Sequence, residues 1–156
     1  MADPVRKQQD RDDQGYDDGY FEATLPDGHH WDVPMMLPRV VEEADHIVVL
    51  PRLGSHALSG YSHGLKCAVG WLRDDSRYHL HDDAASFHEK YTEINYCNEV
   101  ASRLRLVLTF AEAMLLDFGP DTGTIAVADP RIVIASSDIA NHDALSINRH
   151  SEMKSI

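Results

Sequence analysis

The sequence predicts an α/β fold with a mainly parallel sheet, helices on both faces of that sheet, and a small N-terminal hairpin. Three observations support this. Short apolar runs at residues 46–50, 104–110 and 131–136 alternate with stretches of helical pattern, the order expected of βαβ units. The run "HIVVL" is apolar on both faces, as in a strand covered from both sides. Residues 84–103 carry an apolar stripe at three- and four-residue steps, which predicts an amphipathic helix.

The N-terminal part is expected to hold a tail, the hairpin and a short helix. Residues 1–19 have many Asp and Gln and almost no large aliphatic residues, which predicts a flexible acidic tail. In "YFEATLPDGHHWDV", two strand-like stretches flank Pro26–Gly28, where Pro fixes φ and Gly permits a positive φ. A short helix is expected from Pro38 to Ala44, because Pro suits the first helical turn.

Residues 20–156 are expected to form a single domain. Pro51 ends the first apolar strand, and a helix beginning near Ser62 is weakened by Gly64 and Gly70. The polar residues 73–83 are typical of a loop. The elements expected after them are a helix at 84–103, a strand at 104–110, a turn-rich loop at 117–123, a strand at 131–136, and a final helix over 137–150 that begins with the cap-type residues Ser137 and Asp138.

The composition limits the class of partner. The chain has 156 residues, 26 of them acidic and 14 basic, for a formal net charge of −12. Such a surface repels nucleic acid and anionic membranes, and no apolar run reaches the ~18 residues of a membrane span, so we expect neither partner. Cys67 and Cys97 are far apart and form no CxxC pair, so we expect no disulfide framework and no iron–sulfur cluster. The N-terminus is polar and acidic, which is not typical of a signal peptide, and a cytoplasmic location is the simplest interpretation.

The loop "HALSGYSHGLK", His56 to Lys66, is the strongest candidate site. It follows the strand "HIVVL", and ligands of open α/β sheets bind beyond the carboxyl ends of strands. Gly60, Ser62 and Gly64 let the backbone approach a ligand, and amides near a helix start favour an anion.

Three side chains of this loop can carry chemistry. Lys66 supplies a positive charge or a nucleophilic amine, and His56 and His63 can bind a metal or move protons. We take His56 and Lys66 as the candidate catalytic residues. The alternative is an ordinary turn of small residues with solvated side chains.

Two further patterns could contribute to the site. His79 and His81 are two residues apart, so on an extended segment they would face the same way, as a metal pair can require. With His56 they form the predicted metal ligands, and a divalent metal is the cofactor class they suggest. An exposed polar loop is the alternative.

The start of the last predicted helix and the loop before the last strand also carry candidate residues. Asp138, His142 and Asp143 could complete a metal or proton-transfer site, and Asp138 could bind the ligand, although capping of the helix is the stronger alternative for Asp138. Gly119 and Gly123 of "DFGPDTG" could face the ligand, or simply form a tight turn.

Several of these positions resemble the domain-of-unknown-function 362 family. That family shows an apolar strand followed by Leu-Pro and a histidine, then a lysine with a glycine soon after, and farther on a Gly-Pro-x-x-Gly and an Asp-rich segment. The matching residues here are Leu50, Pro51, His56, Lys66, Gly70, Gly119, Pro120, Gly123, Asp138 and Asp143. Two positions depart from the pattern, since Gly54-Ser55 stands where the family has Lys-Thr and Cys67 where it has Asn.

The resemblance implies that the chain corresponds to the C-terminal part of a longer family protein. It would then assemble with itself or with a partner that supplies the upstream half. The stretch from His56 to Lys66 is also similar to the His…Gly-Tyr-Ser-Gly-Gly-x-Lys stretch of nickel-pincer lactate racemases. That resemblance implies a pocket for a ligand or cofactor.

Two functions from different classes follow. The first is a metal- or cofactor-dependent enzyme, or a fragment of one, that acts on a small anionic ligand. The second is a non-catalytic ligand-binding or assembly module whose site has degenerated. The retained His56, Lys66 and Asp138 favour the first, whereas Gly54-Ser55 favours the second.

Overall fold

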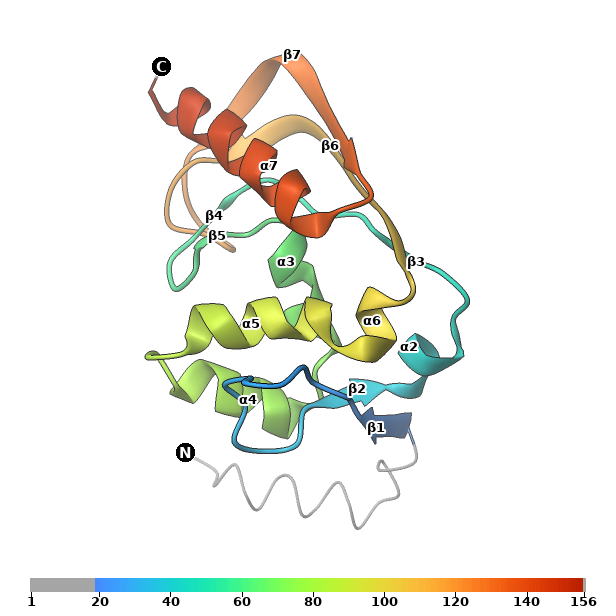
Figure 1. Ribbon diagram of the computed structural model, residues 1–156. Coiled ribbons are helices and arrows are strands. Elements are labelled where there is room, and N and C mark those ends of the chain that lie inside the picture. Colours follow the sequence, from blue (N-terminus) through green and yellow to red (C-terminus); the bar gives the residue numbers. More distant parts are fainter. Residues whose placement is uncertain (1–18, 156) are drawn as a thin grey trace. The chain divides into compact units, whose positions relative to one another are not determined.

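The computed structural model describes residues 19–155, apart from the side chains of residues 129 and 130. The predicted tail, residues 1–19, therefore lies outside the described range except for Gly19. The chain divides into two compact units, and each is built from two segments: unit 1 from residues 19–45 and 68–103, and unit 2 from residues 46–67 and 104–155 (Figure 1). Within the described range, no helix has both the length and the apolar character needed to cross a membrane.

The predicted N-terminal hairpin is present in unit 1. Strand β1 (Tyr20–Glu22) pairs antiparallel with β2 (Met36–Pro38), and the buried Phe21 and Leu37 lie opposite each other. The turn expected around Gly28 forms, with a φ of +80° at that glycine. It lies inside a longer connection, because only the outer ends of the predicted strands pair.

The helices of unit 1 follow the predicted order with two corrections, of which the first concerns residues 84–103. The short helix α2 (Arg39–Glu43) is confirmed, and η2 (Ala68–Trp71) is a 3-10 helix. The predicted helix over 84–103 is divided into α5 (Phe87–Tyr96) and α6 (Asn98–Ala101), because Cys97 between them is extended, with a ψ of 151°.

The prediction of a loop at residues 73–83 is wrong, because this segment forms helix α4 (Asp74–Asp82). Asp74 and Asp75 occupy its first turn and His79 and His81 its last, the charge order that a helix dipole favours. The apolar periodicity that identifies a helix is weak here, since Leu80 is its only buried hydrophobic residue.

Unit 2 contains a three-stranded sheet that corrects the predicted topology. Its order is β3 (Ile47–Val49), β6 (Leu104–Leu115) and β7 (Ile125–Ser136). Strand β3 pairs parallel with β6, but the much longer pairing of β6 with β7 is antiparallel. The sheet is therefore mixed and mostly antiparallel. The short loop at residues 116–124 explains this, since a parallel crossover needs a dozen or more residues.

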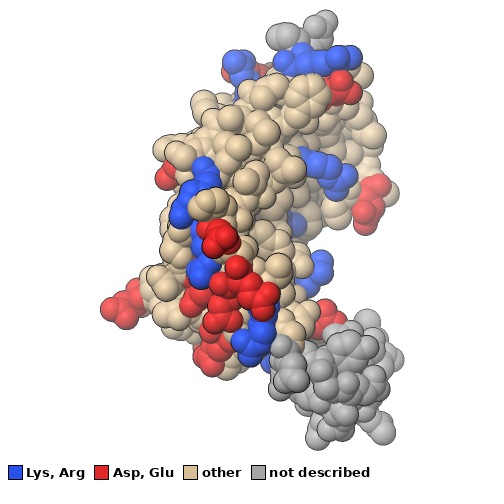
Figure 2. All heavy atoms as spheres, turned by 90° about the vertical axis from the view of Figure 1, so that its right-hand side faces the viewer, with Lys and Arg blue, Asp and Glu red and all other residues tan. Residues whose placement is uncertain are grey.

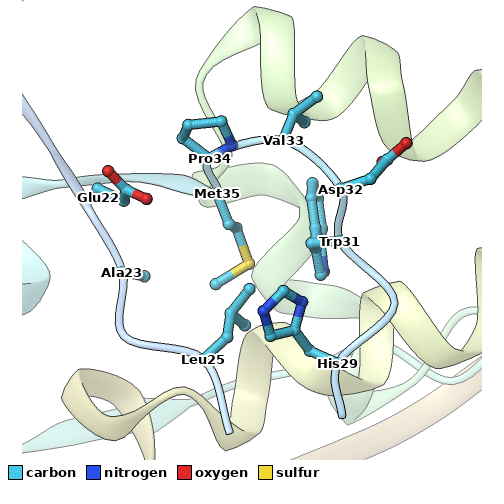
Figure 3. A pocket seen from close by; sticks show the side chains of 9 residues that line it. All are labelled: Glu22, Ala23, Leu25, His29, Trp31, Asp32, Val33, Pro34 and Met35. Atoms are coloured by element: carbon cyan, nitrogen blue, oxygen red, sulfur yellow. The ribbon is translucent and has the colours of Figure 1, made fainter. Parts of the chain in front are cut away.

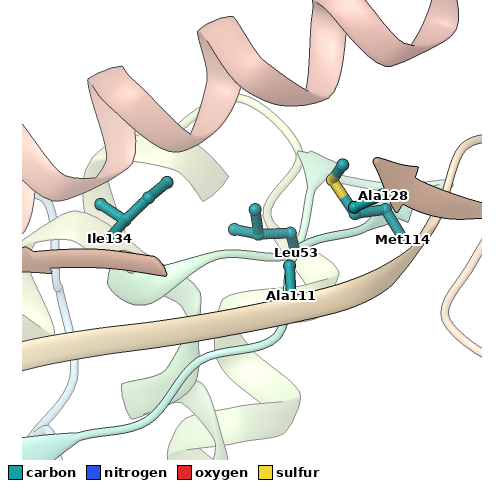
Figure 4. Packing of buried hydrophobic residues seen from close by; sticks show 5 residues of the cluster. All are labelled: Leu53, Ala111, Met114, Ala128 and Ile134. Atoms are coloured by element: carbon teal, nitrogen blue, oxygen red, sulfur yellow. The ribbon is translucent and has the colours of Figure 1, made fainter. Parts of the chain in front are cut away.

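The final helix α7 (Ile139–Lys154) is confirmed, and it packs on β6 and β7 (Figure 1). Between them lies a core of Leu53, Ala111, Met114, Ala128 and Ile134 (Figure 4).

Within unit 2, helix α7 covers one face of the sheet, whereas the sequence predicts helices on both. On the other face, Val48, Phe110 and Val133 are more than half exposed. Figure 2 shows mostly uncharged side chains over the upper part of the view, where β6 and β7 lie.

The candidate loop lies after β3 in unit 2. It holds a small antiparallel pair, β4 (Ser55–His56) and β5 (Gly60–Tyr61), followed by the short helix α3 (Gly64–Cys67). The expected helix start near Ser62 is thus present, although α3 is only four residues long.

Candidate functional site

The imidazole of His56 holds the turn between β4 and β5. Its Nδ1 atom accepts hydrogen bonds from the amides of Leu58 (3.1 Å) and Ser59 (3.4 Å). Gly60 completes the turn with a φ of +74°, a conformation that favours glycine. One ring nitrogen of this predicted catalytic and metal-binding residue is therefore engaged in local structure.

Helix α3 is fixed to α7 by a carboxylate. The amides of Gly64 and Leu65 donate to the two oxygens of Asp143, at 2.8 and 2.9 Å. A Cβ atom at Gly64 would lie 2.7 Å from Asp143 Oδ1, so only glycine fits this approach. The contacts of His56 fix the start of the loop, and those of Asp143 fix its end. The partly exposed Lys66 follows Leu65 in α3.

A buried polar chain continues from Asp143 into the sheet. His142 Nδ1 donates to Asp143 Oδ1 at 2.9 Å, and its Nε2 lies 3.0 Å from the Thr109 hydroxyl. That hydroxyl is also 3.2 Å from the carbonyl oxygen of Pro51. Thr109 and His142 are fully buried. The connectivity is that of a hydroxyl–imidazole–carboxylate triad, and here it connects the loop, β6 and α7.

Next to this chain lies a group of three rings, Tyr61, His63 and His150, which we call the histidine cluster. The ring centroids are 5.4 Å apart for Tyr61 and His63, and 5.6 Å for each of the other two pairs. His63 is 3% exposed and His150 is 0% exposed.

The hydrogen bonding of the histidine cluster is incomplete. Nε2 of His150 donates to the carbonyl oxygen of Leu115 at 2.9 Å, so Nδ1 of the neutral ring carries a lone pair. That Nδ1 atom and both ring nitrogens of His63 have no hydrogen-bond partner within residues 19–155. Most buried polar side-chain atoms in proteins have a partner. Three such atoms in one cluster therefore point to a ligand or ordered water.

Both histidines of the cluster are held neutral. Burial lowers the pKa of His63 to about 4 and lowers the pKa of His150 as well. For His63, a positive charge on Lys154 or on a neighbouring histidine ring acts in the same direction, and Asp143 opposes it.

The loop "DFGPDTG" packs against β4. The Asp117 carboxylate accepts hydrogen bonds from the amide (2.5 Å) and hydroxyl (2.9 Å) of Thr124, and these bonds lower the pKa of Asp117. A Cβ atom at Gly119 would overlap the Ser55 carbonyl oxygen, and one at Gly123 would overlap the Asp117 carbonyl oxygen. Both glycines are thus required by the path of the loop.

The remaining predicted residue at α7 has a structural role. Asp138 Oδ1 accepts from the amide of Asn141 at 2.7 Å, which confirms the capping interpretation of this residue. The amide of Ser62 donates to the Gly54 carbonyl oxygen at 2.8 Å and closes the loop near α3.

The other two predicted metal ligands lie on α4 in unit 1. Nε2 of His79 lies 2.5 Å from Asp32 Oδ1 and 3.0 Å from the Lys90 ammonium, which is 1% exposed. Lys90 also donates to Asp83 at 2.8 Å, which lowers the pKa of that carboxyl. His81 Nδ1 donates to the Arg77 carbonyl oxygen at 2.7 Å. On a helix, residues two apart point in different directions, so the expected extended geometry of this pair is absent.

The predicted site residues are thus divided between the two units. His56, Gly60, Ser62, Gly64, Lys66, Gly119, Gly123 and Asp138 lie in unit 2, and His79 and His81 lie in unit 1. Among residues 19–155, no group of three or more His, Cys, Asp or Glu side chains is arranged to hold a metal ion.

Unit 1 contains a hollow of about 370 Å³ (Figure 3). Nine residues between Glu22 and Met35 line it, and the Met35, Leu25 and His29 side chains turn toward its middle beside the Trp31 ring. No predicted site residue lines it.

Sequence reasoning missed His150 and Thr109 as parts of the polar network. The signal was present in α7, because His142, Ser146 and His150 recur at four-residue steps and so share one face. All three are fully buried. A polar face directed toward the sheet was the feature that could have identified the network.

Comparisons with known proteins bear on the family alone. No curated protein and no solved structure matches the chain. A family model, described as domain of unknown function (DUF362), matches residues 8–148, most of the chain. With this match added to the motif residues of the loop and of α7, the chain belongs to the DUF362 family.

Proposed function

We propose that the chain is an enzyme, or a fragment of one, that binds a small anionic ligand at the histidine cluster and exchanges a proton with it. The observation that carries this proposal is the His63 imidazole, which is 3% exposed and has no hydrogen-bond partner for either nitrogen within residues 19–155. A buried polar group without a partner costs about 1–3 kcal/mol of stability, so its presence in a folded protein requires an explanation, and a bound ligand supplies one.

The protonation state of the cluster suits a ligand-dependent base. With a pKa of about 4, His63 is neutral at pH 7 and offers one donor and one acceptor nitrogen. An anion bound beside the ring favours the imidazolium form and raises the pKa. The ligand would therefore bring His63 toward the range in which general acid–base catalysis is efficient.

The metal-dependent form of this proposal depends on the chemistry of the two histidine rings. Neutral imidazoles are ligands for zinc and nickel, and Nδ1 of His150 and the nitrogens of His63 have the required chemistry. Within the part of the chain that the structure describes, no group of three or more His, Cys, Asp or Glu side chains is arranged to hold a metal ion. Lys66 as a cofactor attachment point, and the relation to lactate racemases, remain part of the proposal on resemblance alone.

A non-catalytic binding or assembly module is the second candidate. Gly54-Ser55 stands where the family has Lys-Thr, and Ser55 has a structural contact, since its hydroxyl donates to the Leu116 carbonyl oxygen at 2.6 Å. The exposed apolar face with Phe110 and Val133 also favours assembly with a second copy or with a partner that supplies an upstream half.

Calorimetric titration of the full chain with inorganic phosphate and with acetate tests binding. We expect the wild-type chain to bind at least one of the two anions, and His63→Phe to abolish that binding. His46→Gln, which changes an exposed histidine of the same unit, is the control and should bind normally. Absence of binding to the wild type, or undiminished binding to His63→Phe, would contradict the proposal.

Two further measurements separate the candidates. Repeating the titration in buffers of different ionisation enthalpy shows proton uptake if His63 acts as a base, and no uptake if the module only binds. Elemental analysis of protein purified without a metal-affinity step tests the metal-dependent form.

A further inference from the structure

The outer side of the histidine cluster is formed by Tyr61 and Lys154. The Lys154 ammonium lies 5.8 Å from the centroid of the Tyr61 ring, and that ring contacts both His63 and His150. Lys154 is exposed and Tyr61 is partly exposed, whereas the two histidines are buried. Among the four residues, exposure falls from Lys154 through Tyr61 to the histidines.

We propose that the Lys154 ammonium binds the negatively charged group of the ligand. The Tyr61 ring covers the cluster, and a ligand must displace it to reach His63. This inference rests on the function proposed above and assigns the binding residue that the function requires. The ligand class is an oxyanion, either a carboxylate or a phosphate group.

The charge of Lys154 is available for a ligand. No carboxylate within residues 19–155 lies at ion-pair distance from its ammonium, although the chain has nearly twice as many acidic as basic residues. The neighbouring cation of the same helix differs, because Arg149 pairs with Glu152 at 2.8 Å. Asp117 is the acidic group whose pKa Lys154 influences, and both of its oxygens already accept hydrogen bonds from Thr124.

The sequence predicts Lys66 as the anion-binding residue instead. That lysine follows Leu65, whose amide binds Asp143 in the first turns of α7. Asp143 and Lys154 are eleven residues apart, about 16 Å along a helix axis, and both influence the pKa of His63. Lys154 lies at the end of α7 that carries His150, and its ammonium contacts the ring that covers the cluster.

Anion affinities of matched lysine variants test the inference. We expect Lys154→Met to weaken binding of phosphate, or of acetate if that is the anion bound, at least tenfold, and Lys154→Arg to retain most of it. Arg149→Met, which removes a cation of the same helix that pairs with Glu152, is the control and should change affinity less than twofold. Lys66→Met tests the other lysine that could bind the anion. Tyr61→Ala should accelerate association, because the cover is removed. Far-UV circular dichroism checks that every variant is folded.

Each outcome distinguishes this inference from the function on which it rests. If Lys66→Met weakens binding and Lys154→Met does not, the inference is overturned and the proposed function stands. The same holds if both lysine variants bind normally while His63→Phe does not bind. If the wild-type chain binds neither anion, only ordered water occupies the cluster, and both proposals fail.

Discussion

Replacing His63 by Phe should change how the stability of the protein depends on pH. The pKa of His63 is about 4 in the folded chain, because of burial, and about 6.5 for an unperturbed histidine. As the pH falls below 6.5, the unfolded chain binds a proton that the folded chain rejects, so the free energy of unfolding falls until the pH reaches the folded pKa. The wild-type chain should lose about 2.5 kcal/mol through this residue between pH 7.5 and pH 4.5.

Phenylalanine keeps the ring and removes the titration. The free energy of unfolding of His63→Phe should therefore not contain this pH-dependent loss. Its advantage over the wild type should grow by about 2.5 kcal/mol between pH 7.5 and pH 4.5. At pH 7.5 the variant should already gain about 1 kcal/mol, since two buried nitrogens without a partner are removed.

Urea unfolding at the two pH values measures this difference. Far-UV circular dichroism is the appropriate signal, because Trp31 and Trp71 both lie in unit 1 and His63 lies in unit 2. His46→Gln is the control for an exposed histidine. If wild type and His63→Phe differ by the same amount at both pH values, to within about 0.5 kcal/mol, the ring is neither buried nor neutral as described, and the reasoning fails.

Three further predictions concern packing, capping and assembly. Gly64→Ala should destabilise the fold by about 1–3 kcal/mol in urea unfolding, because its Cβ would lie 2.7 Å from Asp143 Oδ1, whereas Gly70→Ala, which meets no atom within 4 Å, should not; equal effects would contradict the close approach. Asp138→Ala should cost about 1 kcal/mol by loss of the cap of α7, and an unchanged thermal midpoint would be evidence against the cap. Phe110→Glu should dissociate a homo-oligomer formed through the exposed sheet face, while Val40→Glu, an equally exposed apolar site in unit 1, should not; light scattering that finds the wild type monomeric would exclude this assembly.

Much of the fold could be predicted because periodicity and caps are local signals. The apolar run at 46–50 and the cap at Asp138 identified β3 and the start of α7. The direction of β7 could not be inferred from apolar runs alone, because parallel and antiparallel strands have similar composition. The predicted strands left residues 111–130 between them, enough for a parallel crossover, and the connection is short only because β6 and β7 extend beyond their apolar runs. Helix α4 was missed because it buries little apolar surface.

The sequence alone predicted the region of the candidate site but not the contacts within it. The glycines of the loop indicated a close backbone approach, and Gly64 does make one, but to Asp143. His63 was recognised as chemically capable, yet its burial depends on Tyr61 and His150, and the latter is 87 residues away in sequence. Sequence spacing cannot reveal such a contact. The partners of His79, the buried Lys90 and the exposed Asp32, are likewise distant in sequence and could not be inferred from spacing.

The proposed site depends on a neutral, buried imidazole that responds to an anion, and the pKa of His63 measured with and without ligand tests this most directly. Two-bond ¹H–¹⁵N spectra of the labelled chain resolve its histidine rings, and the His63 signals are those lost in His63→Phe. We expect a pKa near 4 in the free protein and a rise of at least one unit at saturating phosphate or acetate. A pKa near 6.5 in the free protein, or a value unaffected by both anions, would contradict the account.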